Sequence, residues 1–188
     1  LDGMDLLYPC FCTRKDIAAA ASAPHGPDGP IYPGTCRGLA KEEQSSRIAA
    51  NLPYAMRLDV TTAAALAGPL TWRERESGAI AVTPGLFGDV VLARKDIATS
   101  YHLTVTVDDD LQGITLVTRG QDLFEATHIH RLLQALLGLA EPEYHHHRLL
   151  TDERGRRLAK RDDARSLRSL RQAGHTPAKV RAMAGFTS

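Results

Sequence analysis

Three cysteines lie within the first 36 residues, and the rest of the 188-residue chain contains none. Cys10 and Cys12 flank a single phenylalanine, and Cys36 follows a stretch rich in glycine and proline. Alternate residues of an extended segment point to the same side, so Cys10 and Cys12 are expected to face one way, and a loop can return Cys36 to them. Thiolates gathered in this manner are typical of a structural zinc site, which the sequence therefore predicts.

A tetrahedral zinc ion needs a fourth ligand, and His25 and Tyr32 are the nearby side chains that could supply it. Zinc chemistry alone favours the imidazole, because a phenol has an ordinary pKa of about 10. The alternative is three reduced cysteines that pack as small apolar side chains. A disulfide is less favoured, since the number of cysteines is odd and the chain shows no secretory leader.

The composition, 43% hydrophobic and 24% charged, indicates one globular domain with room for a small appendage. No stretch approaches the roughly 18 consecutive apolar residues of a membrane-spanning helix, so we expect no membrane association and a cytoplasmic location. The first residue is leucine rather than methionine, which suggests a fragment of a longer protein.

Positive charge is concentrated near the C-terminus, although the net charge is only +1. Residues 148–171 contain nine arginines or lysines against four acids. Such a surface can attract phosphates, and it can equally be a solvated face with internal ion pairs. Both readings stay open on charge alone.

Hydrophobic periodicity and capping residues indicate short strands that alternate with helices, which is typical of the α/β class. The expected helices cover residues 14–22, 40–50 and 122–137, with a last one that begins at 176–177. The expected strands cover residues 53–60, 70–75, 90–92 and 113–117. Asp122 and Glu125 are expected to cap the helix over 122–137, Gly138 to end it, and its apolar stripe to lie in the core. Residues 101–107 have a β-rich composition, but we do not assign a strand there.

Two basic segments could act on a ligand. Arg119 follows an expected strand and precedes a helix, where a guanidinium can hold a carboxylate, or can instead pair with Asp122. Residues 157–162 carry three basic side chains on an expected hairpin over 151–160. A lysine on a mobile loop can neutralise charge that develops on a phosphate, and the alternative is another solvated charge run.

The order of these segments resembles that of the glutamyl-type class I aminoacyl-tRNA synthetases. The motifs that carry the resemblance are YPCFCTR (8–14), YPGTCR (32–37), DIATSYHL (96–103), 114–123 with RGQDL, and RLAKRD (157–162). Within that class the chain most closely resembles the truncated paralogues that act on queuosine-bearing tRNA(Asp). The paired cysteine motifs and RGQDL support this branch, as does a chain that ends soon after the lysine segment.

The resemblance assigns roles to individual residues. It implies that the zinc ligands are Cys10, Cys12, Tyr32 and Cys36, so that Tyr32 replaces His25 as the expected fourth ligand. Tyr101 and Arg119 match the residues that hold the substrate glutamate. Residues 157–161 occupy the position of the Lys-Met-Ser-Lys-Ser signature, and Lys160 matches its second, ATP-binding and catalytic lysine.

The resemblance also implies a reaction and its partners. Glutamate would be activated by ATP with Mg²⁺, and the glutamyl group would pass to queuosine at the wobble position of tRNA(Asp). The expected fold is the C-terminal portion of a Rossmann-like catalytic domain, formed by residues 53–188, with a zinc-bearing insert at 1–52. We expect one structural Zn²⁺ and a monomer.

The sequence departs from the family pattern in two places. The signature has Arg157 for its first lysine and Ala159 for its serine, and no His-x-Gly-His motif is present, so we expect the N-terminal half of the fold to be missing. The alternatives are a fragment of a synthetase that charges tRNA(Glu) and a non-catalytic zinc-stabilised RNA-binding module. The run His145–His147 is not expected to bind a metal, since neighbouring residues of a strand point to opposite faces.

Overall fold

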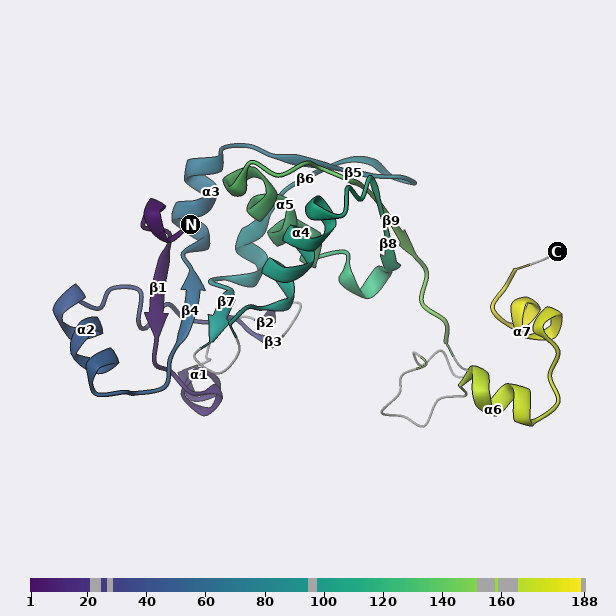
Figure 1. Ribbon diagram of the computed structural model, residues 1–188, viewed down its shortest axis with the longest axis horizontal. Helices are drawn as coiled ribbons and strands as arrows, with labels where there is room; N and C mark the ends of the chain where they lie inside the picture. Colours follow the sequence, from purple (N-terminus) through teal and green to yellow (C-terminus); the bar gives the residue numbers. More distant parts are fainter. Residues whose placement is uncertain (21–24, 27–28, 95–97, 152–157, 159–165, 187–188) are drawn as a thin grey trace. The chain divides into compact units, whose positions relative to one another are not determined.

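The computed structural model describes residues 1–188 except 21–24, 27–28, 95–97, 152–157, 159–165 and 187–188 (Figure 1). Helices and strands alternate along most of the described chain, which confirms the predicted α/β class. The chain divides into two compact units, which we describe separately. Unit 1 comprises 1–119 and 123–146, and unit 2 comprises 120–122 and 147–188.

The strands form three small sheets. The first has the order β1-β4-β7 with antiparallel pairs, and Figure 1 shows these strands side by side; they span Leu7–Cys10, Ala55–Leu58 and Val91–Arg94. The second has the order β6-β5-β9-β8, and its strands span Gly78–Ala81, Thr71–Glu74, Glu143–His147 and Leu116–Gly120. Strand β5 pairs antiparallel with β6 and parallel with β9. The third is a short hairpin of β2 (His25–Gly26) and β3 (Gly29–Pro30).

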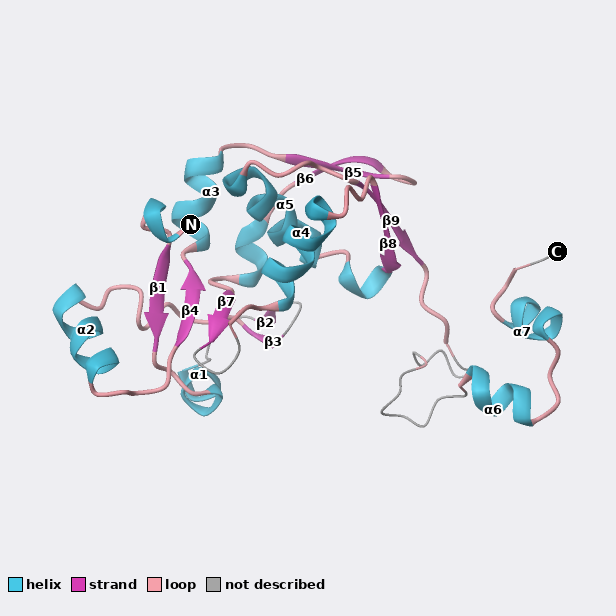
Figure 2. Cartoon of the chain, viewed as in Figure 1, coloured by secondary structure: helices cyan, strands magenta, loops and turns pink. Residues whose placement is uncertain are grey.

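Most helices belong to unit 1 (Figure 2). They are α1 (Arg14–Ala20), α2 (Lys41–Ala49), α3 (Val60–Ala67), α4 (Tyr101–Leu111) and α5 (Ala126–Leu137). Unit 2 contains α6 (Leu167–Gln172) and α7 (Pro177–Met183). Thr176 caps α7, as the sequence predicts, because its hydroxyl accepts the backbone N–H of Lys179 at 3.2 Å.

The main core forms where α3 and α5 meet the first sheet. The apolar stripe of α5 is buried there, as predicted, with Ile129 and Leu133 fully inaccessible. Leu58 from β4 and Leu92 from β7 pack into the same cluster. Gly138 ends α5 with a φ of 66°, a left-handed conformation that glycine adopts without the steric cost of a Cβ atom.

One local expectation differs from the structure, and one segment without an assigned strand is helical. Helix α5 begins at Ala126 rather than at Asp122, and its N-terminal residue Glu125 makes no side-chain cap, so the predicted capping pair is wrong. The β-rich residues 101–107 are helical, because Ser100 caps α4 by accepting the N–H of Leu103. Local capping and tertiary packing outweigh the strand preference of valine and threonine at this point.

Candidate active site and metal centre

The three cysteines form a compact cluster in unit 1. Cys10 ends β1, Cys12 follows two residues later, and Cys36 comes from the turn before α2. The three Sγ atoms all lie within 4.8 Å of one another, and those of Cys12 and Cys36 are 3.6 Å apart. All three are free thiols. The structure thus brings together the residues whose spacing predicts a metal site.

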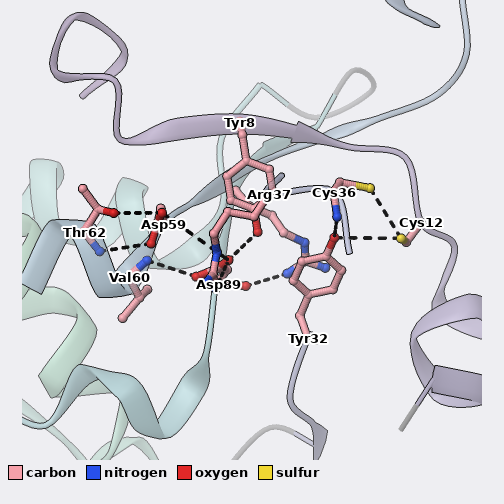
Figure 3. A network of polar contacts seen from close by, with 10 residues as sticks. Tyr8, Cys12, Tyr32, Cys36, Arg37, Asp59, Val60, Thr62 and Asp89 are labelled. Carbon is pink, nitrogen blue, oxygen red and sulfur yellow. Dashed lines mark hydrogen bonds and ion pairs between the residues drawn. The ribbon is translucent and has the colours of Figure 1, made fainter. Parts of the chain in front are cut away.

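The phenol of Tyr32 points into this cluster (Figure 3). Its hydroxyl oxygen lies 3.9 Å from Sγ of Cys12 and accepts the backbone N–H of Cys36 at 2.7 Å. The guanidinium of Arg57 stacks on the Tyr32 ring at 3.9 Å from its centroid, which fixes the ring in place. The side chain of His25 lies outside the described part of the chain.

The three sulfurs of this cluster fit a zinc ion, since thiolates are among its usual ligands, and the oxygen of Tyr32 lies where it could complete a set of four. Burial, followed by the hydrogen bond with Cys36, raises the pKa of Cys12 to about 11. Burial also raises the pKa of Tyr32. For Cys36, burial opposes ionisation, but hydrogen bonds from Tyr32 and from the backbone of Phe11 outweigh it and lower the pKa. A bound cation would favour the deprotonated form of all these groups.

The buried carboxylate of Asp89 connects the cysteine cluster to the first sheet and to α3 (Figure 3). One of its oxygens accepts from the hydroxyl of Tyr8 on β1, and from Nε and Nη2 of Arg37 at 2.8 and 2.6 Å. The other accepts the N–H of Val60 at the start of α3 at 3.1 Å. Since Arg37 directly follows Cys36, this carboxylate anchors the chain that carries the third sulfur.

Replacing Asp89 by alanine is expected to lower the free energy of unfolding by about 3 kcal/mol, because the hydroxyl of Tyr8 and the N–H of Val60 lose their buried acceptor and Arg37 loses its nearer carboxylate. Thermal unfolding should show a decrease in Tm of about 6 to 12 °C. Asp108→Ala, at an exposed position on α4, is the matched control and should change stability by less than about 0.5 kcal/mol. Equal effects of the two substitutions would contradict the anchoring role of Asp89.

Arg119 lies near the end of β8, and two of its guanidinium nitrogens contact a cluster of buried polar side chains. Its Nε donates to Nε2 of His146 at 3.0 Å, and its Nη2 donates to the hydroxyl of Thr127 at 2.5 Å. His146, near the end of β9, in turn contacts Glu74 of β5 through its Nδ1 at 2.6 Å. The guanidinium is therefore attached to a strand pair and to α5 at the same time.

The third nitrogen of the guanidinium contacts His130, which in turn contacts Tyr101. Nη1 of Arg119 lies 3.0 Å from Nδ1 of His130 on α5, and Nε2 of His130 lies 3.1 Å from Nδ1 of His102 on α4. The ring of Tyr101 contacts His130 with 5.7 Å between centroids, and half of Tyr101 is exposed. His130 thus joins the two residues that the sequence predicts to hold glutamate.

A cavity of about 610 Å³ opens beside Tyr101 and His102 within unit 1. Tyr32 of the cysteine cluster and Tyr101 of α4 both line it. Three arginines contribute to its walls, namely Arg14, Arg57 and Arg94. These positive charges, together with one buried carboxylate, suit a polar ligand that carries negative charge.

The predicted site residues therefore divide into three groups. The cysteines with Tyr32 form one cluster, Tyr101 and Arg119 are joined through His130, and Lys160 lies outside the described residues. The sequence analysis missed His146, whose burial follows from the alternation of β9: it is 5% exposed, and its neighbour His147 is exposed. The alternation argument that excluded a shared metal at His145–His147 could have singled it out.

Comparison with known proteins agrees with the motif series. The family of class I tRNA synthetases for E and Q, catalytic domain, matches residues 5–185. The glutamyl-Q tRNA(Asp) synthetase of Rhodobacter capsulatus is 47% identical over 96% of this chain and 67% of its own length. That of Nocardia farcinica is 42% identical over 95% of this chain and 54% of its own length. The chain thus spans between half and two thirds of these relatives.

Solved structures support the same fold. The crystal structure of the glutamate-tRNA synthetase from Elizabethkingia anophelis aligns with a TM-score of 0.63 at 24% identity, over 84% of this chain and 33% of that one. Within the described residues, no helix is long and apolar enough to cross a membrane. With the family match over nearly the whole chain, these findings confirm the resemblance read from the motifs: this chain belongs to the class I glutamyl- and glutaminyl-type tRNA synthetase family.

Proposed function

We propose that this chain forms part of an enzyme that activates glutamate with ATP and transfers it to queuosine at the wobble position of tRNA(Asp). The observation that carries the proposal is the placement of Arg119, which is held by hydrogen bonds to uncharged groups, one of which, His130, also contacts the ring of Tyr101. A guanidinium held in this way can pair with a carboxylate in a bidentate geometry. The names of the relatives, glutamyl-Q tRNA(Asp) synthetases, support the nucleic-acid substrate.

The proposed chemistry needs positioning and charge neutralisation rather than a protein nucleophile. A carboxylate oxygen of glutamate attacks the α-phosphorus of ATP, pyrophosphate leaves, and glutamyl-adenylate forms. A hydroxyl of the queuosine ring then attacks the activated carbonyl carbon, and AMP leaves. Lys160, by its signature position, stabilises the charge that develops on the phosphates together with Mg²⁺ brought by ATP. Arg119 and Tyr101 hold glutamate throughout.

The proposal includes one structural zinc ion in an insert formed by residues 1–52. Its ligands are Cys10, Cys12, Tyr32 and Cys36, which the geometry of the cluster supports. Residues 53–188 belong to the C-terminal portion of a Rossmann-like catalytic domain. The cavity between Tyr32 and Tyr101, with its three arginines, suits the phosphate backbone of the RNA substrate. The protein acts as a monomer.

The test is glutamate-dependent exchange of pyrophosphate into ATP by the full-length gene product, without tRNA. We expect exchange with glutamate and none with aspartate, followed by transfer of labelled glutamate to tRNA(Asp) that carries queuosine. No exchange by folded, zinc-loaded protein would reject the proposal. Transfer to unmodified tRNA(Glu) would select the alternative of a tRNA-charging synthetase, and RNA binding without adenylate formation would select a non-catalytic module.

A further inference from the structure

Three hydrogen bonds to described residues hold the guanidinium of Arg119, and all three go to uncharged acceptors. Their partners are His146 at Nε, Thr127 at Nη2 and His130 at Nη1. A guanidinium has five N–H groups, so these contacts leave one N–H on each Nη nitrogen. Two such groups are the number that a bidentate contact with a carboxylate uses.

Glu74 determines which nitrogen of His146 carries the proton. The carboxylate of Glu74 can only accept, so Nδ1 of His146 donates to it over 2.6 Å. The second carboxylate oxygen accepts the backbone N–H of His146 at 3.1 Å. Nε2 of His146 must then be unprotonated, because it accepts from Nε–H of Arg119. A doubly protonated ring would place two donors against each other.

The same reasoning fixes the proton of His130. Its Nδ1 faces Nη1 of Arg119, which can only donate, so Nδ1 accepts. The proton of His130 is therefore on Nε2, from which it is donated to Nδ1 of His102 at 3.1 Å. Arg119 is thus held by two imidazoles of opposite tautomer, of which that of His146 is set by Glu74 and that of His130 by Arg119 itself.

Burial favours the neutral form of both imidazoles by lowering their pKa values. His146 is 5% exposed and His130 is 2% exposed. Burial and, after it, the charge of Arg119 hold the pKa of His130 well below its ordinary value. Burial lowers the pKa of His146 as well, although Glu74 acts in the opposite direction. The three side chains that accept hydrogen bonds from the guanidinium therefore carry no negative charge themselves.

We propose that His146 and His130 are positioning residues of the glutamate site: His146, with its tautomer set by Glu74, and His130, whose proton is directed to His102, orient Arg119 toward a substrate carboxylate without neutralising its charge. This inference rests on the proposed function for the identity of the ligand. An acidic partner in the same places would orient the guanidinium equally well but would compete with the substrate for its charge. Neutral acceptors orient the guanidinium and do not compete with the substrate for its charge.

The kinetic test compares His146→Ala and His146→Gln with His147→Ala in the full-length gene product. His146→Ala is expected to raise KM for glutamate by about tenfold to a hundredfold, with KM for ATP changed by less than about twofold, because a hydrogen bond to a charged group is lost. Glutamine keeps an acceptor at the end of its side chain, so His146→Gln should return KM for glutamate most of the way to the wild-type value. His147→Ala, on the exposed neighbour, is the matched control and should equal the wild type.

A spectroscopic test is independent of catalysis. In protein with ¹⁵N-labelled histidine, the chemical shifts at neutral pH should show a proton on Nδ1 of His146 and on Nε2 of His130, with assignments from the single variants. The backbone N–H and the Nδ1–H of His146 each need an acceptor oxygen, and Glu74→Gln leaves only one. The Nδ1–H signal of His146 should therefore weaken, or the proton should move to Nε2.

The outcomes separate the two proposals. Folded His146→Ala with unchanged KM for glutamate, while Arg119→Ala abolishes exchange, would overturn the positioning role and leave the proposed function standing. A charged His146 or the opposite tautomer in the spectrum would also overturn it, whatever the activity. Absence of exchange by the wild type, with the expected tautomers present, would reject the glutamate-activating function and leave the orientation of Arg119 intact.

Discussion

Replacing Arg119 by alanine is expected to lower kcat/KM for glutamate by about two to three orders of magnitude in the full-length gene product, measured by pyrophosphate exchange. The substitution removes the only cation in the cluster formed by Glu74, Thr127, His130 and His146. The carboxylate of glutamate would then enter a partly buried site without a charged partner. Exchange should remain dependent on ATP with a KM near that of the wild type.

Two further variants accompany this prediction: Arg119→Lys separates charge from geometry, and Arg73→Ala is the control. Lysine keeps the charge, but its ammonium has only three N–H groups and cannot bind three partners and a carboxylate in a bidentate geometry as well. We therefore expect Arg119→Lys to recover little of the lost activity. Arg73 lies beside Glu74 on β5, but its side chain is 76% exposed and pairs only with Glu143 among the described residues, so its removal should leave exchange unchanged. An Arg119→Ala protein that is folded and has the wild-type KM for glutamate would exclude Arg119 from the site.

Replacing Cys36 by serine is expected to abolish stoichiometric zinc binding and to lower Tm by about 10 °C or more. Cys36 is 3% exposed and its sulfur lies 3.6 Å from that of Cys12, so its loss breaks the cluster at its centre. Wild-type protein purified without chelator should contain one equivalent of zinc by elemental analysis. Removal of the metal with a strong chelator should reproduce the decrease in Tm.

Two further variants test which atoms of the cluster matter. Thr35→Ala changes the exposed residue before Cys36 and should keep both metal content and Tm. Tyr32→Phe removes only the hydroxyl and should weaken zinc affinity by about tenfold or more, with one equivalent still bound at saturation. Zinc-free protein whose Tm does not respond to chelator would contradict a structural metal and leave three packed thiols.

Local patterns in the sequence predicted much of the fold because they depend on near neighbours. The stripe of α5, its end at Gly138 and the start of α7 at Pro177 follow from helical period and terminal residues. The start of α5 and the helical state of 101–107 did not follow, because strand preference competed there with capping by Ser100 and with packing against the core.

The sequence by itself determined which chemical groups the chain can offer: three thiols, a tyrosine in a motif with the third, and an arginine at the end of a strand. The tertiary structure decided which uncharged and acidic groups surround them. Glu74 and His146 are 72 positions apart, and Tyr8 and Asp89 are 81 apart, yet each pair is in hydrogen-bond contact. Such contacts depend on how strands from distant parts of the chain pair and how helices cover them, and no local period or spacing records that.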